Sequence, residues 1–154
     1  MLNINEYTVF YESPIGFIKI TSDDTFVTRC KFVEKEGFTT ELPDILSKAL
    51  AQIDQYFSKE RKEFDLLIAP PGTEFQQKVW LELLRIPYGE ATSYKELALK
   101  IGNDSAVRAV GYANSMNPIN IIIPCHRVLG NDGGLVGYRG GLERKKWLLD
   151  FEKK

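Results

Sequence analysis

The first forty residues contain three short apolar runs separated by turn residues. Their alternation of apolar and polar positions predicts strands near Tyr7–Tyr11, Gly16–Thr21 and Phe26–Val33, with turns at Ser13-Pro14 and Asp23-Asp24. Strands this close along a chain favour antiparallel pairing, because short turns join antiparallel neighbours. A three-stranded antiparallel sheet is therefore predicted at the start of the chain.

The pattern then changes to the period of a helix. Apolar residues recur at helical spacing from about Pro43 to Lys59 and predict one amphipathic helix there. A short strand is predicted at Phe64–Ile68. Because Pro70-Pro71-Gly72 is the strongest break in the sequence, we predict an N-terminal α/β supporting domain over residues 1–70 and a second domain over residues 73–154.

Short helices with clear start signals dominate the second domain. Capping boxes at Thr73–Gln76 and Ser93–Glu96 open predicted helices that end at about Arg85 and Gly102. A further helix is predicted from about Ser105 to Met116. Two short helices joined by a glycine-containing turn form the layout of a helix-turn-helix.

The last 35 or so residues combine a predicted strand, loops and a helix. Ile121–Ile123 is apolar and β-branched, which predicts a short buried strand that Pro124 ends. Glycines predict loops at 130–134 and 137–141. The final helix is predicted over Leu142–Glu152. Its expected core residues are Trp147, Leu148 and Phe151, and its expected solvent face carries Arg144, Lys145 and Lys146.

Composition indicates a globular protein with an uneven charge distribution. The chain has 154 residues, 44% of them apolar, and no run approaches the roughly 20 apolar residues of a membrane span. Its first six residues lack the features of a signal peptide, so a cytoplasmic location is expected. Residues 1–72 carry 8 Lys and Arg against 12 Asp and Glu, whereas residues 73–154 carry 12 against 9. The second domain is therefore the expected face for a polyanion.

One dipeptide carries the candidate chemistry. The single histidine, His126, directly follows Cys125, one of only two cysteines. A cysteine attacks as its thiolate and has an unperturbed pKa of about 8.5, so it needs a neighbouring base or cation, for which His126 and Arg127 are candidates. We expect Cys125 just past a strand end, with a water bridging its sulfur to the imidazole. A second interpretation stays open, in which Cys125 is a buried small apolar residue and His126 a structural histidine.

The cysteine count bounds the other possibilities. Cys30 lies in a strand-like run and is expected to be structural, and both cysteines are expected as free thiols. Two cysteines and one histidine show no paired ligand spacing, so no metal site is expected.

The second helix of the helix-turn-helix suits close approach to DNA. Its residues 105–114 are mostly small, and Arg108 supplies one long cationic side chain. The pattern is also typical of an ordinary core-packed helix with one solvent-facing arginine, so both interpretations stand at this point.

Several separated motifs of the second domain point to one family when taken together. They are Gly89–Tyr94, Ala106–Gly111, Asn117-Pro118, Pro124–Val128, Tyr138–Leu142 and Trp147–Leu149. In this order and spacing they resemble the O6-alkylguanine-DNA alkyltransferases, also called methylated-DNA–protein-cysteine methyltransferases. Residues 1–70 are similar to that family's N-terminal domain only in broad layout. The resemblance implies a ribonuclease H-like first domain and a winged helix-turn-helix-like second domain.

The resemblance also implies an activity. Members of the family repair DNA by moving the alkyl group of O6-alkylguanine, and in some cases of O4-alkylthymine, onto their own cysteine, which would be Cys125. Each molecule would act once, because the thioether product has no good leaving group. No cofactor is implied, because the alkyl donor is the DNA itself. The expected partner is double-stranded DNA with an alkylated guanine, and the expected state is a monomer.

Roles for individual residues follow from the same resemblance. Glu152 would orient His126, which activates Cys125 through water; Tyr94 would hydrogen-bond a ring nitrogen of the flipped base; and Asn117 would tie the recognition helix to the active-site turn. Arg108 would enter the duplex where the base had been. The remaining DNA contacts would come from Ser93, Tyr94, Ala106, Ala109 and Gly111, and the guanine pocket would be lined by Pro124, Val128, Tyr138 and Arg139. This chain departs at position 139 from members of the family that have serine there, so we expect any contact from Arg139 to come from its backbone N–H rather than from a hydroxyl.

Three other functions fit parts of the pattern. A hydrolase with a Cys-His nucleophile would use the same two residues but would turn over repeatedly. Alkyltransferase-like proteins that bind damage without repairing it have another residue in place of Cys125. A transcription regulator would need a sensor or dimer element, and the sequence shows no coiled coil or cysteine-rich segment.

Overall fold

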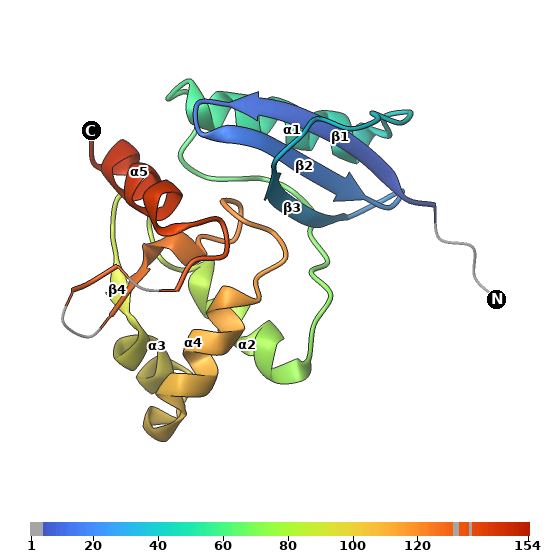
Figure 1. Ribbon diagram of the computed structural model, residues 1–154. Coiled ribbons are helices and arrows are strands. Elements are labelled where there is room, and N and C mark those ends of the chain that lie inside the picture. The colour runs from blue at the N-terminus through green and yellow to red at the C-terminus, as the bar shows by residue number, and fades with distance from the viewer. Residues whose placement is uncertain (1–4, 131–132, 136) are drawn as a thin grey trace. The chain divides into compact units, whose positions relative to one another are not determined.

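A computed structural model describes residues 5–130, 133–135 and 137–154. Residues 1–4 of the predicted first domain, and Asn131 and Asp132 of the loop predicted at 130–134, lie outside the described residues. The chain divides into two compact units, Met1–Pro71 and Gly72–Lys154 (Figure 1).

The first unit is a three-stranded antiparallel sheet covered by one helix, as the sequence predicts. The strands β1 (Tyr7–Ser13), β2 (Gly16–Ser22) and β3 (Val27–Val33) pair in the order β1-β2-β3. Their register aligns Val9, Ile20 and Cys30, all buried, on one face. The helix α1 (Asp44–Phe57) packs against this sheet (Figure 1). Alternation in the strands and helical spacing in α1 thus supply the two apolar faces of one core.

The strand predicted at Phe64–Ile68 is wrong. Only Ile68 forms a bridge, to Val27, through the Leu67 carbonyl and the Ala69 N–H at 2.9 Å each, and residues 64–66 belong to no strand. The reason is a side chain of α1: the Gln52 amide bonds both the N–H and the carbonyl of Asp65, at 2.9 and 3.0 Å. Those backbone groups are therefore already satisfied, and no ladder extends along the segment.

Helices form most of the second unit, and its predicted helix starts are largely confirmed. The helix α2 (Glu74–Leu83) begins with a full capping box between Thr73 and Gln76. At the next start Ser93 caps the Glu96 N–H, but the Glu96 carboxylate bonds the Thr92 hydroxyl instead, so this box is half formed.

A helix-turn-helix follows the second start, which confirms that prediction. It consists of α3 (Tyr94–Lys100) and α4 (Val107–Ser115), with a single 3-10 turn, η1 (Asp104–Ala106), before α4. Gly102 supplies the left-handed backbone of the turn, at φ 81°. The helix α2 contacts α4 through Trp80, whose indole N–H donates to the Ala113 carbonyl at 2.9 Å.

The strand predicted at Ile121–Ile123 is also wrong. The three isoleucines are buried, but Ile121 has φ 70° and the segment folds as successive turns. Its backbone bonds stay local, with the Ile123 N–H donating to the Ile119 carbonyl at 3.1 Å. A run of apolar residues indicates that a segment is buried, but it does not distinguish a buried strand from buried turns.

Cys125 consequently does not follow a strand. It begins the 3-10 turn η2 (Cys125–Arg127), which leads into β5 (Val128–Leu129). The strand β5 pairs in parallel with β4 (Thr92–Ser93), directly before α3. This small pairing places η2 beside the start of the helix-turn-helix.

The last helix, α5 (Leu142–Lys153), confirms the predicted helix but not its predicted faces. Lys145, expected in solvent, is 0% exposed, and Trp147, expected in the core, is half-buried and stacks on Phe151. Lys145, Leu148, Leu149 and Glu152 form the buried face instead. Within the described ranges, no helix is long and apolar enough to cross a membrane.

Candidate active site

Cys125 is buried at the start of η2, with 3% of its surface exposed. Burial raises the pKa of its thiol, while hydrogen bonds from Asn117 and Asn120 and the charge of Lys145 act in the opposite direction. The Asn120 amide lies 3.5 Å from the Cys125 sulfur. Because the net direction is upward, the resting group is a thiol that must lose its proton to a base before it can attack.

His126 is held as a neutral base. Burial lowers the pKa of its imidazole, and the hydrogen bond from Nε2 to Glu152 Oε2, at 2.7 Å, only partly opposes this. A carboxylate can only accept a hydrogen bond, so Nε2 carries the imidazole proton. The other ring nitrogen, Nδ1, then has a lone pair, and it is buried with no hydrogen-bond partner among the described residues. The site therefore presents a bare imidazole nitrogen as a base.

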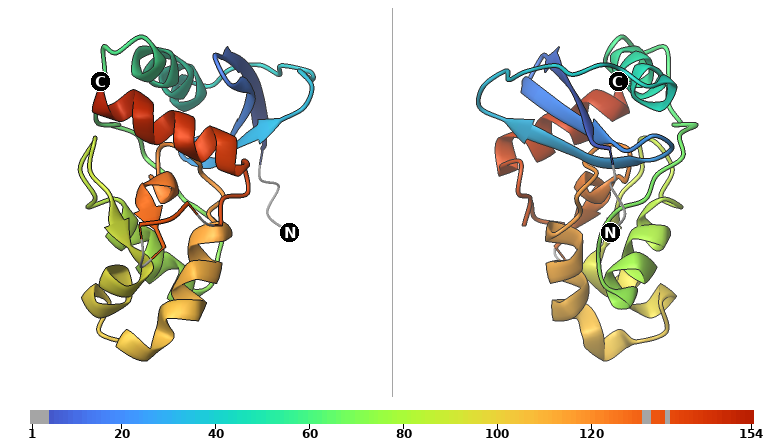
Figure 2. Two further views of the ribbon diagram at one scale, coloured as in Figure 1. Left: turned by 60° about the vertical axis from the view of Figure 1, so that its left-hand side comes forward. Right: turned by 90° about the vertical axis from the view of Figure 1, so that its right-hand side faces the viewer.

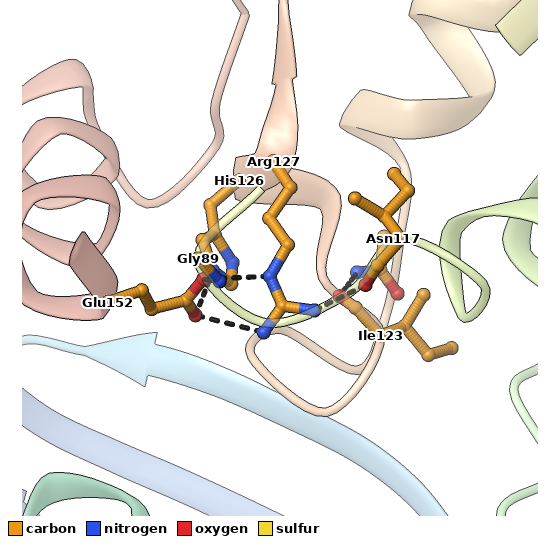
Figure 3. A network of polar contacts seen from close by, with 7 residues as sticks. Gly89, Asn117, Ile123, His126, Arg127 and Glu152 are labelled. Atoms are coloured by element: carbon orange, nitrogen blue, oxygen red, sulfur yellow. Dashed lines mark hydrogen bonds and ion pairs between the residues drawn. The ribbon is translucent and has the colours of Figure 1, made fainter. Parts of the chain in front are cut away.

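Arg127 fixes the carboxylate that orients this imidazole. Its Nε and Nη2 donate to the two oxygens of Glu152 at 2.8 and 3.0 Å (Figure 3). Its Nη1 donates to the Ile86 carbonyl at 2.7 Å. Burial alone would raise the pKa of Glu152, but His126 and Arg127 outweigh it and hold that pKa well below its usual range. The sequence left Arg127 as a candidate cation that could favour the Cys125 thiolate. In the structure its ion pair is with Glu152.

Asn117 braces the turns between α4 and η2. Its Nδ2 donates to the Ile123 carbonyl at 2.9 Å (Figure 3). The same Nδ2 donates to the Ile119 carbonyl at 3.2 Å, and its Oδ1 accepts from the Ile119 N–H at 3.0 Å. Both ends of the side chain are used. This arrangement links the end of α4 to the backbone just before Cys125.

Tyr94 begins α3 and reaches the same site. Its hydroxyl lies 3.5 Å from the Gly137 carbonyl, and the Asn114 amide lies 3.5 Å from the hydroxyl and 3.3 Å from the Cys125 carbonyl. The Lys145 ammonium is 5.8 Å from the centre of the Tyr94 ring. Burial lowers the pKa of Lys145 to about 8.

Asn114 and Lys145 lie in the site, although the sequence predicted neither as a site residue. A signal for Lys145 was available, because it lies seven residues before Glu152 and so two turns earlier on the same helix face. For Asn114 no sequence signal was available, since a polar residue on a small-residue helix is usually exposed.

The predicted pocket residues differ in how much of each is exposed to solvent. Pro124 and Val128 flank η2 and are buried, and Tyr138 is 9% exposed. Arg139 is exposed, and its guanidinium lies 2.9 Å from the Met116 sulfur. Gly137 has φ 55°, and a Cβ there would lie 3.3 Å from the Tyr94 hydroxyl, so glycine keeps the loop close to the tyrosine.

The predicted DNA-contact residues lie on the helix-turn-helix. Arg108 and Ala109 are exposed, whereas Ser93, Ala106 and Gly111 are half-buried. Buried Val110, Ala113 and Asn114 form the opposite face of α4.

A second thiol and possible metal ligands are the other groups with candidate chemistry. Cys30 is buried in the sheet, and burial raises the pKa of its thiol to about 12. In the part of the chain that the structure describes, no three His, Cys, Asp or Glu side chains are grouped to hold a metal ion.

Comparison with known proteins gives consistent matches for both units. Residues 7–70 match the family model of the 6-O-methylguanine DNA methyltransferase ribonuclease-like domain, and residues 74–154 match that of the DNA-binding domain. A methylated-DNA–protein-cysteine methyltransferase of Methanosarcina acetivorans is 45% identical over 152 residues, which cover 95% of this chain and 97% of the relative.

Solved structures agree with these matches. The crystal structure of the O6-methylguanine methyltransferase of Mycobacterium tuberculosis has a TM-score of 0.88 at 44% identity, covering 97% of this chain and 93% of the other. The structure of Mycobacterium tuberculosis OGT in complex with DNA has a TM-score of 0.85 at 46% identity, covering 96% and 92%.

Proposed function

This chain belongs to the 6-O-methylguanine DNA methyltransferase family, and on that premise we propose that it repairs O6-alkylguanine in DNA by transferring the alkyl group to Cys125. The observation that carries the assignment of Cys125 is the adjacent imidazole, which burial keeps neutral and which Glu152, itself bound by Arg127, orients with Nδ1 bare. A cysteine beside such a base is equipped to become a nucleophile.

The reaction begins with proton transfer. A water molecule carries the Cys125 proton to Nδ1 of His126, and the resulting imidazolium is stabilised by the ionised Glu152. The thiolate attacks the alkyl carbon, forming the carbon–sulfur bond as the carbon–oxygen bond breaks. The electron pair of that bond leaves with the purine. Direct displacement at an alkyl carbon forms no tetrahedral oxyanion, so no oxyanion hole is required.

The lesion must leave the duplex before it can reach a buried sulfur. Flipping the nucleotide costs a few kcal/mol, and insertion of Arg108 from α4 into the vacated stack offsets part of this cost. Exposure of Arg108 and Ala109 on the helix-turn-helix supports this role.

The flipped base then lies against the loops around η2. The Tyr94 hydroxyl donates to a ring nitrogen and spreads the charge of the departing purine, while Asn117 holds the turn that carries Cys125. Pro124, Val128, Tyr138 and the backbone of Arg139 line the pocket for the base. O4-alkylthymine, with the same exocyclic alkoxy group, is a second substrate.

The product is a thioether that the protein cannot release, so each molecule acts once. Neither the proton transfer nor the displacement at the alkyl carbon needs a cofactor. The protein acts as a monomer in the cytoplasm, where a reducing environment keeps the Cys125 thiol available.

Intact-protein mass spectrometry tests the proposal. After incubation with excess duplex carrying O6-methylguanine, we expect one methyl group per molecule, located on Cys125 by peptide mapping. The Cys125→Ser variant should gain none, whereas Cys30→Ala, which removes a thiol with a pKa near 12, should react like the wild type. More lesions repaired than protein molecules present would indicate a hydrolase and overturn the proposal.

A further inference from the structure

Asn114 lies between Tyr94 and Cys125, and no step above uses it. It belongs to α4, and only 1% of its surface is exposed. Its Nδ2 lies 3.3 Å from the Cys125 carbonyl oxygen and 3.5 Å from the Tyr94 hydroxyl. The side chain therefore joins the active-site turn to the tyrosine.

The chemistry of the carbonyl fixes the direction of both bonds. The Cys125 carbonyl can only accept, so the amide group that faces it must be the NH2. The same NH2 faces Tyr94, so the phenol oxygen accepts from it. An amide NH2 has two hydrogens, and both bonds can form together.

A phenol that accepts this bond keeps its single proton for another acceptor. In the structure that acceptor is the Gly137 carbonyl, at 3.5 Å. A contact this long is a weak hydrogen bond. The proton can therefore turn toward the ring nitrogen of an incoming base at little cost.

A purely structural role fits Asn114 poorly, as comparison with Asn117 shows. Asn117 uses both ends of its amide to brace the backbone. The Oδ1 of Asn114 is buried and has no hydrogen-bond partner within the described part of the chain. A half-satisfied buried amide is a costly way to stabilise a helix, so its contact with Tyr94 is the feature that needs an explanation.

We propose that Asn114 is a positioning residue that keeps the Tyr94 hydroxyl oriented as a hydrogen-bond donor toward the flipped guanine. The inference rests on the proposed function and deepens it. Burial raises the pKa of Tyr94, so the phenol stays protonated. The bond from Asn114 acts in the opposite direction, and this contribution makes the hydroxyl a stronger donor than it would be without Asn114. Tyr94 keeps its proton throughout: the electron pair of the broken carbon–oxygen bond stays on the purine, and the hydrogen bond stabilises it.

Single-turnover kinetics on O6-methylguanine duplex test the proposal. Asn114→Leu, which is similar in size and apolar, should slow the saturating transfer rate by about threefold to tenfold, the value of one lost hydrogen bond. The duplex concentration that gives half-maximal rate should stay unchanged. Asn114→Ala serves as a second variant in case the leucine disturbs folding.

A double-mutant cycle with Tyr94→Phe separates positioning from structure. Phenylalanine has no hydroxyl to orient, so adding Asn114→Leu or Asn114→Ala to it should change the rate by less than about twofold. Val110→Ala, at another buried position of α4, is the control; it should lower the melting temperature without slowing transfer by folded molecules.

Full additivity of the Asn114 and Tyr94 substitutions would overturn the proposal, as would an unchanged rate in Asn114→Leu. Failure of the wild type to label Cys125 would instead overturn the proposed function, so the two failures are distinguishable.

Discussion

At the scale of single residues, Glu152 is the carboxylate to which the imidazole and the guanidinium of the site bind. Its side chain is 1% exposed and accepts from His126, Arg127 and, at 3.4 Å, the Gly89 N–H (Figure 3). The carboxylate therefore sets the imidazole proton on Nε2 and neutralises a buried guanidinium at the same time. Removing its charge should affect both stability and catalysis.

Glu152→Gln leaves Arg127 buried without an anion, which costs about 3–5 kcal/mol in comparable buried pairs. We expect a loss of that size in urea unfolding and a slower single-turnover transfer. Asp150→Asn is the matched control on α5, because Asp150 pairs with Lys146 in solvent. Equal stability of the two variants would contradict the assigned role of Glu152.

Lys145 is a second buried charge. Its burial lowers the stability of the folded protein at neutral pH, and its charge acts to lower the pKa of the Cys125 thiol. The pKa of Lys145 is lowered to about 8 from 10.5, so the unfolded chain binds this proton more strongly than the folded chain. Stability contributed by this group therefore rises as pH increases from about 8 to about 10.5, and at pH 7 the folded state bears the cost.

Lys145→Met should therefore stabilise the protein at pH 7, by up to about 3 kcal/mol. The same change should slow transfer, because the ammonium charge acts to lower the pKa of the Cys125 thiol. Chemical denaturation and single-turnover rates measure the two effects. Lys146→Met, at the exposed neighbouring position, should do neither; a destabilised Lys145→Met would contradict this account.

At the scale of elements, the two helices of the helix-turn-helix carry different functional residues. Figure 2 shows α3 and α4 together at one end of the second unit, away from α5. The start of α3 carries Tyr94 toward Gly137 of the loop, while the outer face of α4 carries Arg108. The residue proposed to enter the duplex and the residue proposed to contact the flipped base thus lie on two adjoining helices.

Arg108→Ala should reduce repair of duplex lesions more than reaction with free O6-benzylguanine, since only the duplex requires flipping. Rates on both substrates measure the difference. Arg85→Ala, at an exposed arginine just after α2, is the control for charge and should leave both rates nearly unchanged. Equal losses on the two substrates would argue against insertion of Arg108.

Two glycines test the loop before α5. Gly137 and Gly133 both have positive φ, at 55° and 82°, so alanine strains the backbone at either position by about 1–2 kcal/mol. Only at 137 does a Cβ approach the Tyr94 hydroxyl, at 3.3 Å. Gly137→Ala should therefore slow transfer and Gly133→Ala should not. Indistinguishable rates would show that the loop is not held against Tyr94.

At the scale of the whole molecule, the buried network should govern stability in acid. His126 has a folded pKa below its ordinary 6.5, so from that pH downward the unfolded chain gains a proton that the folded chain resists, and stability falls. Glu152 also has a lowered pKa, so its stabilisation is present above about 4.5 and is lost as pH falls through the folded value.

Melting temperature measured against pH should therefore decline below about pH 6.5 and more steeply below about pH 4.5. Glu152→Gln should melt lower at neutral pH and lack most of the second decline. A wild-type profile that is flat from pH 7 to pH 4 would contradict the burial of this network.

Local patterns determined much of the fold. Alternation along the first three strands, the Thr73–Gln76 capping box and Gly102 act over a few residues, and each predicted its element correctly. Family motifs in the sequence pointed to Cys125, His126 and Glu152 as a group, and the structure brings His126 and Glu152 into direct contact.

Tertiary structure decided what local patterns leave open. The isoleucines 121–123 are buried in turns rather than a strand, because backbone bonding depends on which partners lie nearby. Lys145 and Asn114 are polar by sequence, yet neighbours distant in the chain bury them beside Tyr94 and Cys125. Spacing along a chain fixes which residues share a face, whereas the environment of that face, and with it every shifted pKa in the site, exists only once the helices have packed.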